Sequence, residues 1–196
     1  MNKLFIIFFA GVLFLFSCKK STPSMDTPQS TIKHITLNLF FDASLNAVLQ
    51  NVDYNKDSSY DFELLCDRHA GFSSSKISLS RLVSTFFPMD FAIKNEGVGT
   101  SYPVNVLLNV NDNINDQAGV WQSNSVLFLS DVLNSSLGLN NKGPAYIPIR
   151  FRNIQLSSSD YYYGWIKVDV SDKYKVNIME AAYNTKVNAA LKAGEK

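Results

Sequence analysis

Oxygen-bearing side chains recur at alternate positions in one short segment of the chain. Asp53, Asn55 and Asp57 are two residues apart, and Asp61 follows four residues after Asp57. A hard cation such as calcium needs several such oxygens converging from a tight turn. The spacing therefore predicts a calcium site formed by Asp53, Asn55, Asp57 and Asp61.

This segment resembles the D-x-N-x-D-G-x-x-D calcium loops of extracellular β proteins, with two departures. Ser58 replaces the turn glycine, and Lys56 adds a competing positive charge. The helical version of a calcium loop is excluded, because Leu64 stands where that loop needs its last carboxylate. Asn, Asp and Ser also favour turns through their own backbone hydrogen bonds, so a polar hairpin loop without calcium is the favoured alternative.

Aromatic side chains form a second candidate site. Tyr161, Tyr163 and Trp165 share one face of a predicted strand, where they could form a platform for the rings of a sugar. Aromatic stripes in strands more often pack against neighbouring strands, so a structural role is the favoured alternative.

Signatures of catalysis are sparse. The chain has no G-x-S-x-G elbow, no H-E-x-x-H motif and no glycine-rich phosphate loop. Asp61 and Glu63 share one strand face, as a glycosidase pair could, but they lack the E-x-D-x-x-E order of jelly-roll glycosidases, and a solvated strand face is favoured. The two histidines, His34 and His69, are interpreted as surface residues. A non-enzymatic role is favoured, and the alternative is a polysaccharide hydrolase with carboxylates from separate strands.

Short alternating runs dominate the chain from Thr31 onward, separated by clusters of Asn, Asp, Ser and Gly. Such runs are typical of antiparallel strands. The apolar positions that share a face are Ile35, Leu37, Leu39 and Phe41; Val104, Val106, Leu108 and Val110; Ile147, Ile149 and Phe151; and Ile166, Val168 and Val170. Residues 31–196 are therefore predicted to form one all-β domain, an antiparallel β-sandwich (jelly-roll-like) or barrel. Short helices are expected near residues 130–137 and 187–192.

Cys66 and the overall charge balance each allow one prediction. Cys66 falls on the apolar side of the alternation that includes Tyr60, Phe62 and Leu64, which predicts a buried core cysteine. Without Lys3 the chain has 17 basic and 17 acidic residues, and no basic stripe is present. Nucleic acid is therefore not an expected partner.

The N-terminus has the features expected of an export signal. Lys3 precedes an unbroken apolar run of thirteen residues, 4–16. A helix of that length reaches only about 20 Å, short of the roughly 30 Å hydrocarbon core, so a secretory signal peptide at residues 1–17 is favoured over a spanning helix. Residues 19–30 are rich in Lys, Ser, Thr and Pro and are interpreted as a flexible linker. No later stretch has the length and hydropathy of a spanning helix.

The string Leu15-Phe16-Ser17-Cys18 resembles a lipobox, the cleavage motif of bacterial lipoproteins. The resemblance implies cleavage before Cys18 and acyl chains on its sulfur and amine, which would anchor the domain to a membrane. Lys19, not aspartate, follows the cysteine, so the resemblance favours the outer membrane. The acidic surface-export signal of Bacteroidota lipoproteins is absent after Cys18, which favours a periplasm-facing domain.

The last fifty residues contain an ordered series, Tyr163-Gly164-Trp165-Ile166, Ala182-Tyr183-Asn184 and Ala193-Gly194. This series resembles the ending of a group of mostly uncharacterised secreted β proteins, and it implies a β fold without established catalytic residues. The sequence therefore predicts an envelope lipoprotein that binds a glycan or an envelope protein, or that has a structural role.

Overall fold

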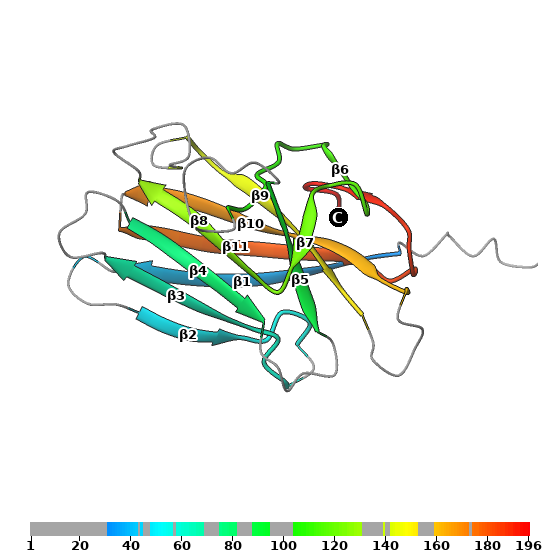
Figure 1. Ribbon diagram of the computed structural model, residues 1–196, viewed down its shortest axis with the longest axis horizontal. Helices are drawn as coiled ribbons and strands as arrows, with labels where there is room; N and C mark the ends of the chain where they lie inside the picture. The colour runs from blue at the N-terminus through cyan, green and yellow to red at the C-terminus, as the bar shows by residue number, and fades with distance from the viewer. Residues whose placement is uncertain are drawn as a thin grey trace, which may run out of the picture.

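The structure is a computed structural model, which describes residues 31–42, 44, 48–56, 58–68, 75–81, 88–94, 104–130, 139, 142–152, 159–172 and 174–196. All regular secondary structure within these ranges consists of β-strands, as the alternating runs predict (Figure 1). Cys18, the linker, Asp57, His69 and most of the helix expected at residues 130–137 lie outside the described residues.

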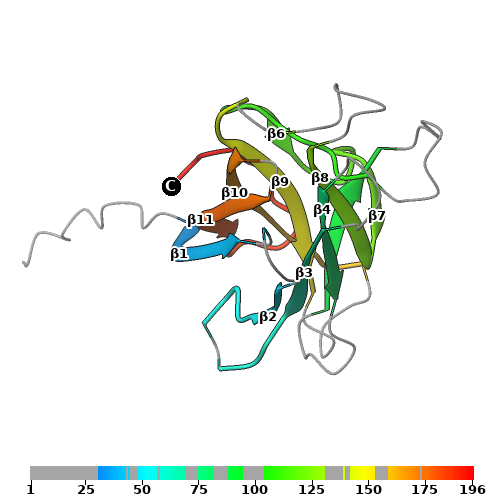
Figure 2. The ribbon, with the colours of Figure 1, turned by 90° about the vertical axis from the view of Figure 1, so that its left-hand side faces the viewer.

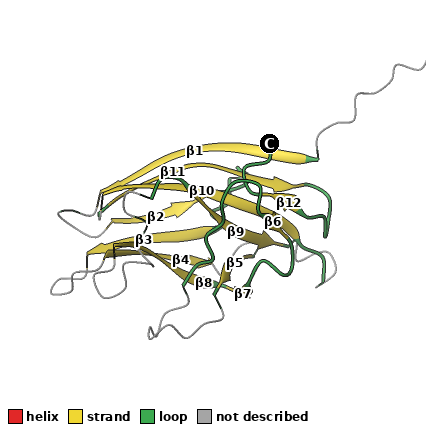
Figure 3. Ribbon diagram, turned by 90° about the horizontal axis from the view of Figure 1, so that it is seen from above, coloured by secondary structure: helices red, strands yellow, loops and turns green. Residues whose placement is uncertain are grey.

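Two large antiparallel sheets form the layers of the domain, and β6 (Asn113–Ile114) and β12 (Leu191–Lys192) form a third, two-stranded sheet. The larger sheet has the order β1 (Ile32–Asp42), β11 (Lys175–Asn184), β10 (Tyr162–Asp172), β9 (Ala145–Phe151), β5 (Met89–Ile93), β7 (Val120–Gln122). The smaller sheet has the order β2 (Val48–Val52), β3 (Phe62–Arg68), β4 (Ser75–Arg81), β8 (Asn124–Ser130). Neither sheet closes on itself, so the domain is a β-sandwich, and the two layers are visible in Figure 3.

The main core lies between the two sheets. Alternation along β9 and β10 directs one set of apolar side chains inward, as the sequence predicts. Ile147, Ile149 and Phe151 of β9 and Ile166 of β10 are nearly or fully inaccessible to solvent. Phe62, Leu64 and Cys66 of β3 contribute from the opposite sheet, so the prediction of a buried core cysteine is confirmed. Tyr60, however, precedes the strand and is exposed.

The outer face of the larger sheet is also covered. The C-terminal segment crosses β10 and β11 on the side away from the smaller sheet (Figure 2). Its short strand β12 (Leu191–Lys192) pairs with β6 (Asn113–Ile114). The cover and the sheet together bury a second apolar cluster, Ile114, Tyr146, Tyr163, Trp165, Ala182, Leu191 and Ala193.

Gly164 lies where two parts of the structure come too close for a side chain. A Cβ there would lie 2.6 Å from the carbonyl oxygen of Ala182 and 2.6 Å from the Tyr54 hydroxyl. That hydroxyl donates a hydrogen bond of 2.7 Å to the same carbonyl. Burial raises the pKa of Tyr54 well above its ordinary value, which keeps the proton available for this bond. Gly164 therefore allows the close approach that its position in the sequence suggests.

Two predicted elements are wrong. Residues 104–110 alternate like a strand but form only isolated bridges, such as those of Asn105 with Ile93 and of Leu108 with Tyr146. The backbone of this segment bonds first to β5, at Ala92, and then to β9, at Tyr146, so no continuous ladder develops. The helix expected at residues 187–192 is a turn followed by β12, because Leu191 is buried in a strand pairing with Ile114.

An ion-pair network stabilises the outer face beside the C-terminal segment. Glu180 of β11 accepts hydrogen bonds from His34 (2.6 Å), Lys196 (2.6 Å) and Lys167 (3.2 Å). Burial alone would raise the pKa of this carboxyl group, but the hydrogen bonds from Lys196, His34 and Lys167 outweigh it and lower the pKa from 4.5 to about 2. The stabilisation is therefore present above pH 4.5 and is lost as the pH falls toward 2.

We expect Glu180→Gln to lower the free energy of unfolding by about 1 kcal/mol at pH 7, a modest value because solvent screens partly exposed pairs. The difference from the parent should narrow steadily between pH 4.5 and pH 2, where the parent carboxylate itself becomes protonated. Urea denaturation at several pH values measures both effects. A difference that is the same at pH 7 and pH 2.5 would show that the charge of Glu180 does not contribute.

Candidate functional site

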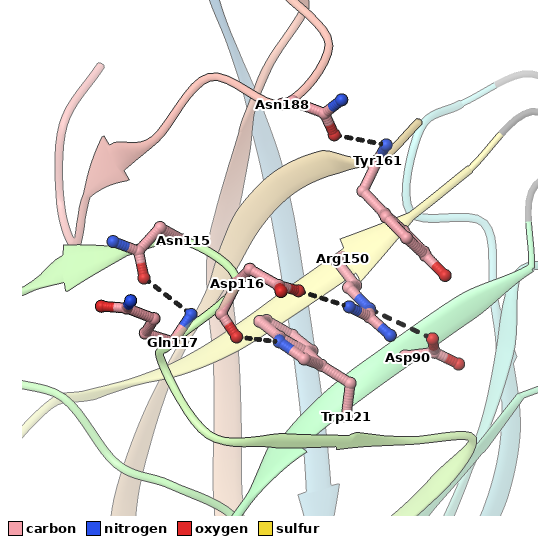
Figure 4. Close-up of polar contacts among 8 residues, drawn as sticks. All are labelled: Asp90, Asn115, Asp116, Gln117, Trp121, Arg150, Tyr161 and Asn188. Atoms are coloured by element: carbon pink, nitrogen blue, oxygen red, sulfur yellow. Dashed lines mark hydrogen bonds and ion pairs between the residues drawn. The ribbon is translucent and has the colours of Figure 1, made fainter. Parts of the chain in front are cut away.

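The best candidate site is an open hollow of about 600 Å³ on the outer face of the larger sheet. It lies beside β9 and β10, at the end of the sheet where β10 begins, and most of its residues appear in Figure 4. We call it the Arg150 hollow, and it is lined by Asn115, Asp116, Gln117, Arg150, Ser159, Tyr161, Tyr163 and Asn188.

Arg150 occupies the centre of this group. In the sheet it lies opposite Asp90 of β5 on one side and Tyr163 of β10 on the other. Its Nε donates to Asp90 (3.3 Å), and its Nη1 donates to Asp116 (2.8 Å), as Figure 4 shows. Both bonds join charged groups, which makes them stronger than neutral hydrogen bonds. The guanidinium is therefore fixed in one position in the hollow.

Two aromatic rings also contact the guanidinium. Its central carbon lies 4.0 Å from the centroid of the Tyr161 ring and 4.9 Å from that of Trp121. Both distances are within the range of cation–π attraction. The Trp121 Nε1 donates to the backbone oxygen of Asp116, which fixes the orientation of the indole (Figure 4). Aromatic and charged groups thus hold one another in place before any ligand binds.

Backbone contacts hold the two rims of the hollow. On one rim, the side-chain oxygen of Asn115 accepts a hydrogen bond from the backbone nitrogen of Gln117 (2.9 Å). On the other, Asn188 accepts from the backbone nitrogen of Tyr161 (3.0 Å) and donates its own backbone N–H to Tyr161 (2.7 Å). Asn188 adopts a left-handed conformation with a φ of 56°, which asparagine tolerates better than most residues. The C-terminal segment therefore joins β10 at the edge of the site.

Tyr163 supplies a neutral hydroxyl at the bottom of the hollow. Burial, together with the negative charge of Asp116, raises the pKa of Tyr163 above its ordinary value, although Arg150 acts in the opposite direction. The hydroxyl therefore stays protonated at neutral pH. A protonated phenol can both donate to and accept from a bound hydroxyl group.

The three aromatic residues predicted as a platform separate into two groups. Tyr161 and Tyr163 line the hollow, as a ligand site requires. Trp165 is fully buried, and its ring lies perpendicular to that of Tyr146 with centroids 5.3 Å apart. The structure therefore gives Trp165 a packing role, which was the favoured alternative. Sequence reasoning missed Arg150, Asp116, Trp121 and Asp90, which come together only through strand pairing and one loop.

The predicted calcium loop lies in the hairpin connection between β2 and β3. Asp61 is buried and accepts hydrogen bonds from the backbone nitrogens of Tyr54 (2.7 Å) and Asn55 (3.3 Å). Asp53 accepts from the backbone nitrogen of Ser58 (2.9 Å). These contacts are those of a polar hairpin, and Asp57 lies outside the described residues. Calcium binding here stays a prediction.

Asp61 does not lie on the solvated strand face expected for the pair with Glu63. It precedes β3 and is buried, because its carboxylate bonds the backbone of the hairpin. In the described part of the chain, no three His, Cys, Asp or Glu side chains gather as a metal site would require.

Comparisons with known protein families, with curated proteins and with solved structures each found no match. Across the described ranges, no helix has the length and hydropathy needed to cross a membrane.

Proposed function

We propose that the chain is a lipid-anchored protein of the bacterial cell envelope whose β-sandwich binds a glycan in the Arg150 hollow. The observation that carries the proposal is the fixed arrangement of Arg150 between two carboxylates and two aromatic rings at the edge of an open hollow. This role is non-enzymatic: the site recognises a ligand and releases it unchanged.

The residues of the hollow match the surface of a sugar. A sugar presents hydroxyl groups that both donate and accept hydrogen bonds, and weakly polar C–H faces that pack on aromatic rings. The carboxylate of Asp116, the amides of Asn115 and Gln117 and the hydroxyl of Tyr163 offer both kinds of partner. Tyr161 adds an aromatic ring beside them. A few fixed polar groups beside an aromatic surface are typical of small-molecule sites.

The ion pairs favour binding over hydrolysis. A glycosidase needs one carboxylic acid that is protonated to assist the leaving sugar oxygen. Asp90 and Asp116 both bond the same guanidinium, so an oxygen of each carboxylate is occupied in holding Arg150. The pair is therefore better suited to orienting Arg150 than to transferring a proton.

The anchor proposed at Cys18 is compatible with the position of the first strand. β1 begins at Ile32 and forms one edge of the larger sheet, so the chain enters the domain at its surface. A linker of this length extends to roughly 40 Å at about 3.1 Å per residue. We propose that it holds the domain near the outer membrane, facing the periplasm.

We expect Tyr161→Ala to weaken binding of the recognised glycan at least about tenfold, which corresponds to about 1.4 kcal/mol. The substitution removes the ring that stacks against Arg150 at the edge of the hollow. A glycan array probed with the full chain in detergent would select the ligand, and calorimetric titration would compare the variants. Tyr60→Ala is the matched control, because Tyr60 is exposed and does not line the hollow. Equal losses in both variants, or an array without any bound glycan, would contradict the proposal.

A further inference from the structure

A second pocket, of about 340 Å³, lies on the opposite face of the same strand ends. Tyr162 and Phe151 line this pocket, whereas their sequence neighbours Tyr161, Tyr163 and Arg150 line the Arg150 hollow. Strand alternation explains the division, since successive side chains point to opposite faces of a sheet. The two pockets are therefore separate sites built on the same two strands. We call the second one the Lys33 pocket.

Two lysines bring positive charge to the Lys33 pocket. Lys33 of β1 donates to the backbone oxygen of Asn55 (3.1 Å), which directs its ammonium group toward the pocket. Lys56 lies in the β2–β3 connection with a φ of 59°, and its exposed side chain reaches the same space. Neither lysine forms an ion pair with any carboxylate among the described residues. The pocket therefore holds two positive charges without a negative partner from the described chain.

Aromatic rings form the wall beside these charges. Phe151 and Tyr162 are stacked with centroids 5.4 Å apart, and Phe151 meets Tyr183 edge to face at 5.0 Å. Tyr162 and Tyr183 are only partly buried, so part of each ring is available to a ligand. The buried Tyr54 ring packs under both Phe151 and Tyr183, which fixes the wall from below.

We infer that the Lys33 pocket binds an anionic sugar, with the acidic group between Lys33 and Lys56 and the ring against Tyr162 and Tyr183. A simple inorganic anion would use the lysines but not the aromatic wall. A neutral sugar would use the wall but leave two charges unmatched. A sugar that carries a carboxylate or a phosphate satisfies both features. The inference does not depend on glycan binding in the Arg150 hollow, because the two pockets share no lining residue.

Calorimetric titration of the full chain in detergent tests this inference with four probes: glucuronate, glucose 6-phosphate, glucose and inorganic phosphate. We expect glucuronate, glucose 6-phosphate or both to bind at least tenfold more tightly than glucose and inorganic phosphate. The relative affinities of the two acidic sugars identify the preferred anion. Raising the salt concentration from 50 to 500 mM should weaken binding roughly threefold or more, because salt screens exposed charges.

Lys33→Gln and Lys56→Gln should each weaken binding of the acidic sugar at least fivefold. Lys94→Gln is the matched control, because Lys94 is exposed and lies outside the pocket. Tyr162→Leu should weaken binding of the acidic sugar while leaving any weak binding of inorganic phosphate unchanged, and melting curves of each variant verify that it folds. Tyr161→Ala should leave binding in the Lys33 pocket unchanged, which separates this test from that of the Arg150 hollow. Failure of both acidic sugars to bind, equal affinity for glucose or phosphate, or equal losses in Lys94→Gln would overturn the inference.

Discussion

Trp165→Ala should lower the free energy of unfolding by roughly 3–5 kcal/mol, the range for removing a large buried aromatic side chain. Trp165 is fully buried between β10 and the covering C-terminal segment. Its ring packs against Tyr146 at 5.3 Å and lies 6.2 Å from the His34 ring. Loss of the indole would leave a cavity under the cover and loosen the segment that carries Asn188 to the Arg150 hollow.

Trp165→Phe distinguishes packing from polarity. The Trp165 Nε1 is buried and has no hydrogen-bond partner within the described part of the chain. A buried donor without a partner destabilises the folded state. Replacing the indole by a phenyl ring removes this unpaired N–H, but it also removes some of the volume that fills the core. We expect Trp165→Phe to lower the free energy of unfolding by less than about 2 kcal/mol. Urea denaturation measures both variants, and a loss below 1 kcal/mol for Trp165→Ala would contradict the proposed cover.

Cys18→Ser should move nearly all of the protein from the membrane fraction to the soluble fraction. A single acyl chain gives only marginal membrane binding, whereas two or more anchor a protein stably. The lipobox resemblance implies that these chains are on Cys18, so we expect the serine variant to lose all of them at once. Incorporation of labelled palmitate should disappear in the same variant.

Cys66→Ala provides the matched cysteine control for the anchor. Cys66 is buried in the core and inaccessible to a lipid-transfer enzyme in the folded domain. The control variant should keep both membrane association and palmitate label. A Cys18→Ser protein that still sediments with membranes after an alkaline wash would show that the anchor lies elsewhere.

The alternation of apolar and polar residues along the chain was sufficient to predict much of the fold. In β9 and β10 the inward residues, such as Ile149 and Ile166, follow directly from the two-residue period of a strand. The same rule failed at residues 104–110, because a segment that divides its hydrogen bonds between two strands keeps the pattern without forming a ladder. It also missed the pairing of β6 with β12, because each has only two residues and too little sequence for a periodic signal.

The sequence predicted the tyrosines of the candidate site but not the charged residues beside them. Tyr161 and Tyr163 were identified because their spacing in a predicted strand places them on one face, although Tyr161 directly precedes β10 in the structure. Arg150 was missed, because its partners come from β5 and from the loop at Asp116. Long-range register of this kind depends on the whole sheet, and no local pattern in the sequence encodes it.

The most direct test of glycan binding in the Arg150 hollow is to follow the two indole N–H signals of the chain by nuclear magnetic resonance during titration. The sequence has two tryptophans, Trp121 and Trp165. The Trp121 indole bonds Asp116 and contacts Arg150, so a sugar in the hollow should shift its signal progressively to saturation. The Trp165 signal should stay in place, because its side chain is buried outside the lining of the hollow. A glycan that binds saturably but leaves the Trp121 signal unchanged, or shifts only the Trp165 signal, would contradict binding in this hollow.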